Sequence, residues 1–281
     1  WEKIKAENAN TKDKDQKKRL PRRPSLPIKP SAGKNYPSNL FNGKINPLIG
    51  YGIRGVIWYQ GERNSNGKFS DLYDKQLETL ITDWRQRWST PELPFAWVQL
   101  PNFRALQSNP SEPSGWVNVR EGMRRALSIP HTGMAITVDV GDAKNIHPRN
   151  KQAVGGRLAR WALVDVYQQG NKLPGGNVAM GPLLKSLQTV GDRINLTFEQ
   201  VGKGLKSSKN PLQGFAIAGK DQVFHWAEAE ANGDQVSVWS KQVPNPVAVR
   251  YSWAANPAGN LTNSIDLPAS PFRTDAWTEV E

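Results

Sequence analysis

Two short polar clusters in the chain combine residue types that can do chemistry. The first is Gln60-Gly61-Glu62, which follows the apolar run at residues 53–57. A glycine allows close backbone approach and offers a free N–H, and a neighbouring amide side chain adds a second donor for a developing oxyanion. A carboxylate such as Glu62 can accept a substrate hydroxyl or hold a loop. A plain turn would need only Gly, Asn or Asp, so the Gln and the Glu indicate a candidate site.

The second cluster contains Asp139, Asp142 and His147, the last within the string Asn-Ile-His-Pro. A histidine just before a helical pattern, with carboxylates upstream, is a candidate general base. Each cluster also has a structural interpretation: the Gln-Gly-Glu side chains cap the next helix, His147 bonds the backbone, and the two aspartates pair with Arg or Lys. Taken singly, each cluster favours the structural interpretation, whereas two clusters at one edge of a sheet favour a site.

The elements that would position these clusters alternate along the chain from about residue 50. Apolar runs predict strands, and apolar residues at helical spacing predict helices. This alternation predicts a parallel sheet covered on both faces, and ligands bind such sheets at the carboxyl ends of the strands, where both clusters fall. Strands are expected at 53–59, 95–100 and 134–140, and helices at 71–88, 116–127 and 151–167.

After Gly170 the pattern changes to short alternating segments, which predict an antiparallel β-sandwich or half of one. The turns at 190–193 and 218–221 are typical of hairpins. We therefore divide the chain into a basic Pro-rich linker at 1–36, an α/β domain at 37–170 and a β-sandwich domain at 171–281. Strands of the last segment are expected at 183–190, 193–199, 214–218, 223–227, 235–239 and 246–251.

Composition excludes several classes of function. The 281 residues contain no cysteine, so thiolate catalysis, disulfide frameworks and zinc fingers are ruled out. The three histidines are widely spaced, so we expect no multi-histidine metal centre. The eleven tryptophans are candidate stacking platforms for sugars. Those at helical spacing are expected in the core instead: Trp84, Trp88 and Trp161.

The net charge of +12 belongs mostly to the N-terminal arm. Residues 1–34 include eleven basic and four acidic residues, whereas the remaining 247 residues include 26 basic and 21 acidic ones. We expect the arm to be extended or disordered. No aromatic residue interleaves its charges, so no nucleic-acid partner is expected, and no apolar run suits a membrane span. Because the chain starts at Trp1, we expect it to be an excerpt of a longer product.

Longer strings resemble the sialate O-acetylesterase family, within the SGNH-type serine esterases. The resemblance covers about residues 36–281 and implies a flavodoxin-like three-layer α/β/α hydrolase domain, incomplete at its N-terminus, with an attached β-sandwich. Its strings are IRGVIWYQGERN, GDAKNIHPRNKQAVGGRLARWAL and LPASPFRTD, supported by PSNLFNGKINPLI, GMAITVDVGD, LQGFAIAGKD and NPVAVRYSWAANP.

The resemblance also implies roles for single residues. The WYQGE string is similar to the family block that lines the oxyanion and substrate side of the site, so Gln60, Gly61 and Glu62 carry over, with Asn64 as a further candidate oxyanion donor. His147 matches the family's catalytic histidine. Arg63 stands where the family usually has a small residue, which puts a bulky cation near the site.

Two departures from the family pattern concern the rest of the triad. Members commonly carry Asp three residues before the histidine, where this chain has Lys144. We take Asp142 as the triad acid, with Asp139 behind it and Asn145 or a backbone carbonyl as the alternative support for the ring. The family's Gly-Gln-Ser-Asn motif has no match here, since Ser65 and Ser70 lie in another context. We therefore expect the nucleophilic serine on an N-terminal segment before Trp1.

These observations lead to one main hypothesis and two alternatives. The main hypothesis is a carbohydrate O-acetylesterase that acts on sialic acid, with no metal or cofactor, located outside the cytoplasm in the periplasm or in secreted form. Its expected partners are the acetylated sugar and the N-terminal segment that carries the serine. The alternatives are a non-catalytic carbohydrate-binding relative and an acetylesterase for plant polysaccharide of the xylan type.

Overall fold

The computed structural model describes residues 1–21 and 36–278, which belong to two units divided after Tyr51. In the first unit, α1 (Glu2–Asn10) is followed by a loop in which Asn8 and Lys18 exchange two hydrogen bonds. The expected extended or disordered segment is thus helical at residues 2–10, because its Glu, Lys and Ala favour helix. The rest of this prediction falls partly on residues 22–35, outside the described residues. A π-helical turn (Phe41–Ile45) and a 3-10 turn (Asn46–Leu48) complete the unit.

In the second unit, three strands form the predicted parallel sheet, in the order β1-β2-β3. They are β1 (Val56–Trp58), β2 (Phe95–Val98) and β3 (Thr132–Ala135), and both strand pairs are parallel. β3 ends earlier than the expected 134–140, because its ladder stops where β2 stops. The chain then turns, with Val140 N–H bonded to the Thr137 carbonyl, and so delivers the second polar cluster to a loop.

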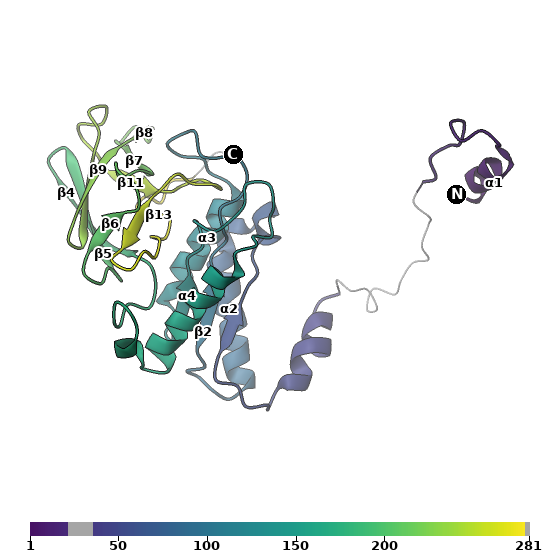
Figure 1. The fold of residues 1–281 in the computed structure, drawn as a ribbon, viewed down its shortest axis with the longest axis horizontal. Helices are drawn as coiled ribbons and strands as arrows, with labels where there is room; N and C mark the ends of the chain where they lie inside the picture. Colours follow the sequence, from purple (N-terminus) through teal and green to yellow (C-terminus); the bar gives the residue numbers. More distant parts are fainter. Residues whose placement is uncertain (22–35, 279–281) are drawn as a thin grey trace. The chain divides into compact units, whose positions relative to one another are not determined.

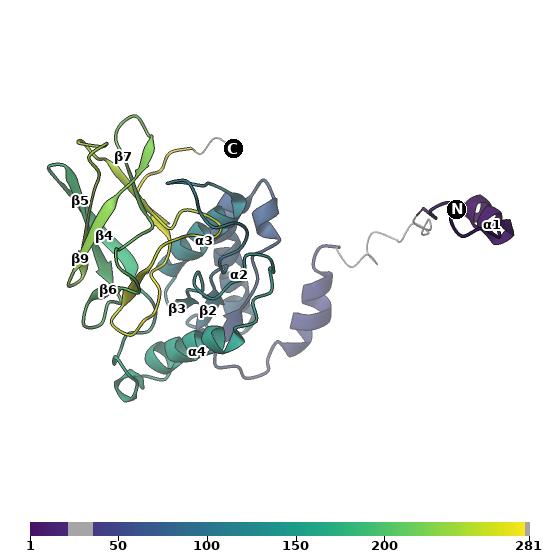
Figure 2. The same cartoon turned by 45° about the horizontal axis from the view of Figure 1, so that its top comes forward.

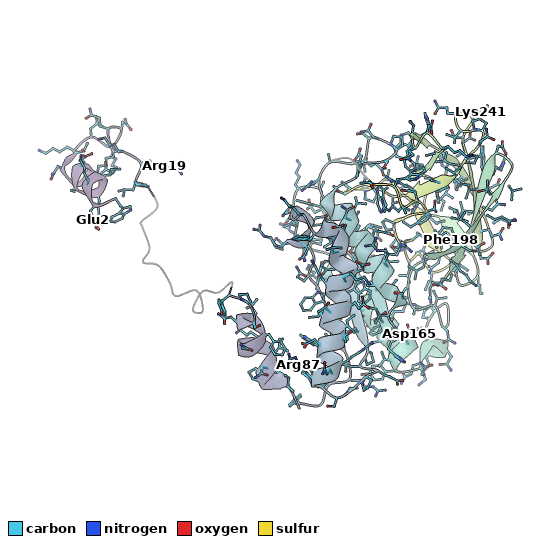
Figure 3. The ribbon with its side chains drawn as sticks, turned by 180° about the vertical axis from the view of Figure 1, so that it is seen from behind. Glu2, Arg19, Arg87, Asp165, Phe198 and Lys241 are labelled. Atoms are coloured by element: carbon cyan, nitrogen blue, oxygen red, sulfur yellow. The ribbon has the colours of Figure 1, made fainter. Side chains whose placement is uncertain are left out.

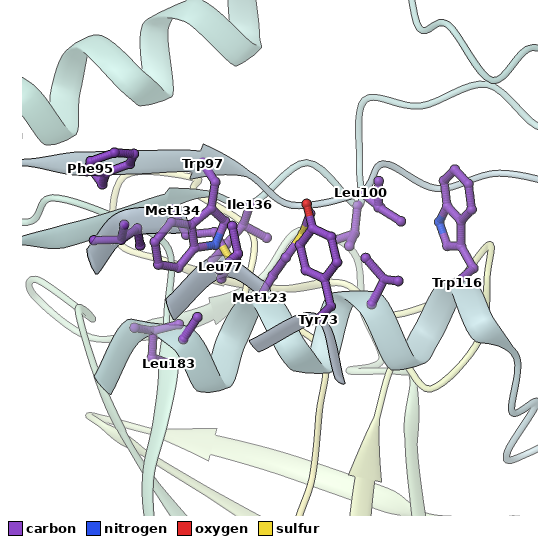
Figure 4. Packing of buried hydrophobic residues seen from close by; sticks show 14 of the residues in the cluster. Tyr73, Leu77, Phe95, Trp97, Leu100, Trp116, Met123, Met134, Ile136 and Leu183 are labelled. Carbon is purple, nitrogen blue, oxygen red and sulfur yellow. The ribbon is translucent and has the colours of Figure 1, made fainter. Parts of the chain in front are cut away.

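Helices cover both faces of this sheet, as Figures 1 and 2 show. The helices α2 (Tyr73–Arg87) and α3 (Gly115–Arg125) pack on one face, where β2 presents Phe95 and Trp97 (Figure 4). The helix α4 (Lys151–Trp161) packs on the other face. Short helical turns join these elements: Asn64–Asn66, Ser70–Leu72, Ala126–Ser128, Ala162–Val166 and Gly170–Lys172.

The face under α4 is built from small residues. Ala96, Val98 and Ala135 are buried there against Val154, Leu158 and Trp161 of the helix. A Cβ atom on Gly133 of β3 would lie 2.1 Å from Trp161 Nε1, so this position requires glycine. The sequence alternation along β2, large then small, therefore decides which helices pack on which face.

The predicted sandwich consists of two four-stranded antiparallel sheets, β4-β5-β10-β9 and β13-β11-β7-β8, and a two-stranded pair, β12-β6. Their inner faces meet in one apolar core. Within it Phe198 of β5, labelled in Figure 3, contacts Phe272 of β13 edge-on. The strands are β4 (Leu183–Val190), β5 (Arg193–Glu199), β6 (Leu205–Ser207), β7 (Phe215–Ala218), β8 (Phe224–Trp226), β9 (Glu228–Asn232), β10 (Gln235–Trp239), β11 (Ala248–Tyr251), β12 (Leu261–Asn263) and β13 (Phe272–Arg273).

A fully buried arginine joins the helical layer to the sandwich. Arg120 of α3 is 1% exposed and donates to the carbonyl oxygens of Leu100, Pro101, Ala254 and Ala255. Burial lowers the pKa of this guanidinium to about 9. Because its donors are satisfied by carbonyls from both parts of the chain, the loop after β2 and the loop after β11 are held together at this residue.

Candidate active site

Residues of both polar clusters line one cavity of about 420 Å³, which we call the His147 pocket: Gln60 and Glu62 come from the first cluster and His147 from the second, whereas Gly61, Asp139 and Asp142 are not among its lining residues. One wall follows β1, and the other belongs to the loop between β3 and α4. The pocket therefore lies at the carboxyl end of the parallel sheet, as expected for a ligand site in such a fold. Its lining residues are Tyr59, Gln60, Glu62, Arg63, Ile146, His147, Pro148 and Lys151.

A hydrogen-bond network holds the Gln60 side chain. Gln60 Nε2 donates to Asn64 Oδ1 at 2.8 Å, and Asn64 Nδ2 donates to Gln76 Oε1 at 2.5 Å. The Tyr73 hydroxyl donates to the Gln60 carbonyl at 2.7 Å and accepts from Trp58 Nε1 at 3.4 Å. Among the described residues, one N–H of each amide is thus occupied, and the second N–H of Gln60, which lines the pocket, remains for a ligand, whereas Asn64 does not line the pocket.

Gly61 is buried and has a φ of +155°, which an L side chain rarely adopts. An added Cβ would lie 2.8 Å from Met123 Cε and 3.2 Å from Leu100 Cδ2. Its N–H makes no hydrogen bond to any residue that the structure describes, while its carbonyl accepts from Asn64 N–H at 3.0 Å. Gly61 does not itself line the His147 pocket, so its role as an oxyanion donor stays a prediction.

His147 lies on an exposed loop that is shaped by two successive Asx turns. Asp142 Oδ1 accepts from the N–H groups of Lys144 and Asn145, at 2.8 and 3.1 Å, and Asn145 Oδ1 accepts from His147 N–H at 2.9 Å. Within the described ranges, no hydrogen bond or ion pair joins Asp142 to His147. The other carboxylate oxygen, Asp142 Oδ2, forms no hydrogen bond or ion pair with any described residue. The role of Asp142 as the triad acid therefore stays a prediction.

Asp139 has a different partner. Both of its carboxylate oxygens are bound by Arg157 of α4, at 2.6 Å each. This is the ion pair that the structural interpretation of Asp139 predicts. The next loop residues are anchored to the segment after β2: Gly141 N–H donates to Asn102 Oδ1 at 2.6 Å, and Arg104 N–H donates to the Ala143 carbonyl at 3.0 Å.

Cations outnumber carboxylates around the pocket. Arg63 and Lys151 carry positive charge, and Glu62 is the lining carboxylate. The Lys151 Nζ lies 4.5 Å from the centre of the Tyr59 ring and donates to its hydroxyl at 3.1 Å. The pocket therefore favours an anionic or polar ligand. Among the described residues, no group of three or more His, Cys, Asp or Glu side chains is placed to hold a metal ion.

Neither Ser65 nor Ser70 lines this pocket, in agreement with their sequence context. Ser65 Oγ donates to the Glu62 carbonyl at 2.7 Å, and Ser70 Oγ accepts from Asn118 Nδ2 at 3.3 Å. Among the residues that the structure describes, no serine lines the His147 pocket. Three side chains contribute to the site but were not predicted from the sequence. Periodicity assigns Tyr73 only to the core and does not reveal the role of its hydroxyl. Tyr59 directly precedes the Gln60 cluster, and Lys151 is the first residue of α4.

Comparisons with known proteins place these features in a family. Residues 39–163 match the family described as carbohydrate esterase, sialic acid-specific acetylesterase. Rat sialate O-acetylesterase is 30% identical over 282 residues, which cover 90% of this chain and 50% of that protein. The human sialate O-acetylesterase is 29% identical, with 90% and 52% covered.

A solved structure supports the same grouping. The crystal structure of a novel carbohydrate acetylesterase from Xanthomonas citri is similar, with a TM-score of 0.78 and 41% sequence identity. The match covers 85% of this chain and 54% of that one. The chain thus spans about half the length of the relatives it matches.

Residues 39–163 thus match this carbohydrate esterase family, and the mixed α/β fold agrees with that of the solved acetylesterase. The resemblance to the sialate O-acetylesterase family, inferred from the sequence, is confirmed. No described helix has both the length and the apolar character that a membrane span requires.

Proposed function

We propose that this chain is part of a carbohydrate O-acetylesterase that removes O-acetyl groups from sialic acid by a serine and histidine mechanism. The observation that carries the proposal is the His147 pocket, whose lining combines the histidine with Gln60 and Glu62 at the carboxyl end of a parallel sheet. The names of the similar proteins support the substrate class. The three parallel strands with helices on both faces support a flavodoxin-like hydrolase fold.

In the proposed reaction, a serine Oγ attacks the acetyl carbonyl carbon while His147 takes the serine proton. His147 then delivers this proton to the sugar oxygen as it leaves, and water cleaves the acetyl-enzyme to acetate. Gly61 N–H and the unoccupied amide N–H of Gln60 or Asn64 would stabilise the oxyanion, each contributing about 3 kcal/mol. Asp142, through its Oδ2, is the acid we propose for His147.

The proposal assigns the serine to a polypeptide segment outside these 281 residues. The exposed surface of β1 supports a place for it. Strands of parallel sheets are normally buried on both faces, yet Ile57 is 67% exposed, and among the described strands β1 pairs with β2 alone. A segment that covers this strand would bring its own residues to the end of β1, beside Gln60.

The charge of the pocket supports an acidic sugar over a neutral one. Sialic acid carries a carboxylate, and Arg63 and Lys151 offer it two cations. Acetylated xylan lacks this group and would leave both cations without a ligand partner. We therefore rank the plant-polysaccharide alternative second. A location outside the cytoplasm, periplasmic or secreted, belongs to the same proposal because it suits a glycan substrate.

A non-catalytic carbohydrate-binding relative is the other candidate. One observation favours it: the described residues provide no carboxylate bonded to the His147 ring, since Asp139 is paired with Arg157 and Asp142 Oδ1 holds the loop. Sugar binding without acetate release, in the longest natural product that contains this chain, would select this alternative.

The deciding experiment measures acetate release from O-acetylated sialic acid by that longest product. We expect activity in the parent protein, its loss in His147→Ala, and its retention in His225→Ala, the matched histidine control on β8. We also expect the 281-residue chain alone to be inactive. Activity of the chain alone that His147→Ala removes would place the nucleophile within these residues, and full activity of His147→Ala in the longest product would refute the mechanism.

A further inference from the structure

A second cavity, of about 480 Å³, lies on the sandwich where the chain passes from β8 to β9. We call it the sandwich groove. Trp226, Glu228 and Trp239 line it on the strands, and the segment 211–214 with Ala258 forms the facing wall. It shares no residue with the His147 pocket, and its size falls in the range of small-molecule sites.

Two indole rings give the groove aromatic surface. Trp226 is 41% exposed, and in the described part of the chain its indole makes no hydrogen bond or ring contact. Trp239 is held from one side, because the Arg193 guanidinium lies 4.0 Å from its ring centre. Arg193 itself does not line the groove. The guanidinium thus covers one side of the Trp239 ring, and the residue still lines the cavity.

The facing wall is preformed. Asn260 Oδ1 accepts from Gln213 N–H at 2.8 Å, and its Nδ2 donates to the carbonyls of Lys209 and Pro211, at 2.7 and 3.0 Å. Gly214 adopts a φ of +90°, and an added Cβ would lie 2.4 Å from Gly259 Cα. A loop tied at three points requires little ordering when a ligand binds.

Polar groups in the groove are available to a ligand. Glu228 lies directly opposite Trp239 in the β9-β10 ladder, and both Glu228 and Gln213 are exposed. Across the described residues, neither side chain forms an ion pair or hydrogen bond. Of the described residues that line the groove, only Glu228 is charged, and it gives the groove a negative charge. A carboxylate repels a carboxylated ligand and accepts hydrogen bonds from hydroxyl groups.

We propose that the sandwich groove binds a neutral sugar residue of a glycan. The C–H face of a pyranose ring would stack on Trp226 or Trp239, while its hydroxyls would donate to Glu228 and bond the Gln213 amide. Its charge preference is opposite to that of the cationic His147 pocket, so the two cavities favour different sugar residues. The binding inference does not depend on the esterase activity.

The test follows the indole N–H signals of the ¹⁵N-labelled 281-residue chain during titration with lactose, xylobiose and, separately, free sialic acid. Trp226→Phe and Trp239→Phe assign the two relevant signals. We expect a neutral sugar to move both, with a dissociation constant on the order of 1 mM, and sialic acid to leave them in place. Glu228→Ala should weaken binding at least about tenfold.

Glu230→Ala is the matched control, since Glu230 is exposed on the same strand but does not line the groove. It should bind like the parent chain, and thermal unfolding should show that both variants are folded. The proposal fails if neither neutral sugar moves the two signals, or if sialic acid moves them more strongly. It also fails if Trp226→Ala and Glu228→Ala bind like the parent.

Discussion

Arg157 binds both carboxylate oxygens of Asp139, with 2.6 Å between each terminal nitrogen and its oxygen. Arg157 belongs to α4, and Asp139 belongs to the turn after β3. The pair therefore ties the helix to the start of the loop that carries His147. The Arg157 side chain is only 13% exposed, so loss of its partner would leave a poorly solvated charge.

We expect Asp139→Asn to lower the free energy of unfolding by about 1–2 kcal/mol, because one partner of a partly buried ion pair disappears. Urea unfolding followed by tryptophan fluorescence measures this change. Asp83→Asn is the control, since the Asp83–Arg87 pair is exposed at both ends. Equal effects of the two substitutions would show that the Asp139 pair has no special role.

Asp142→Asn separates the two roles of Asp142. The Asn oxygen can still accept from the N–H groups of Lys144 and Asn145, so the Asx turn should survive. If Asp142 supports His147 electrostatically, kcat for acetate release in the longest natural product should fall about 10³- to 10⁴-fold. A kcat within a few-fold of the parent value would mean that Asp142 serves only the loop.

Much of this architecture could be predicted because it depends on local patterns. Period-2 and helical apolar spacing located β4, β5 and β10 at their observed bounds and found α2 to within two residues at each end. The helix expected at 151–167 begins at the predicted residue, but α4 ends at Trp161 and a π-helical turn continues it to Val166. The parallel sheet and the meeting of the two polar clusters then followed from topology, because parallel strands bring their carboxyl ends to one edge.

The missed features depend on contacts between distant segments. β6 and β12 pair with each other, yet neither has a clear alternating pattern of its own. The carbonyl partners of Arg120 come from two separate loops, and no local spacing reveals them. Likewise, periodicity places Tyr73 in the core but does not show that its hydroxyl bonds the Gln60 carbonyl.

Gly61→Ala tests the close packing under the candidate oxyanion donor. The new methyl would meet Met123, Leu100 and Val119 at a strained φ, so we expect a loss of about 1–3 kcal/mol in the free energy of unfolding. Gly156→Ala is the matched control, because this exposed glycine of α4 has open space around it. That substitution should stabilise the chain by about 0.5–1 kcal/mol. Urea unfolding compares them, and a neutral Gly61→Ala would contradict the packing.

Alkaline pH should destabilise the chain through Tyr73. Burial, with a smaller contribution from Glu62, raises the pKa of Tyr73 from 10.0 to about 12. The folded state therefore keeps a proton that the unfolded state loses, and this stabilisation is complete below pH 10 and lost as the pH rises from 10 to 12. In that window Tyr73 should lower the free energy of unfolding by about 1.4 kcal/mol per pH unit.

Tyr73→Phe should remove this part of the slope, whatever its effect on stability at neutral pH. Burial also raises the pKa of Tyr251 to about 12, so Tyr251→Phe should reduce the slope by a similar amount. Urea unfolding at several pH values between 9 and 12 measures the slopes, and other groups that titrate in this range contribute equally to parent and variants. If Tyr73→Phe and the parent chain show the same slope, the Tyr73 hydroxyl has the same pKa in the folded and unfolded states. That result would contradict the buried hydrogen bond from the Tyr73 hydroxyl to the Gln60 carbonyl.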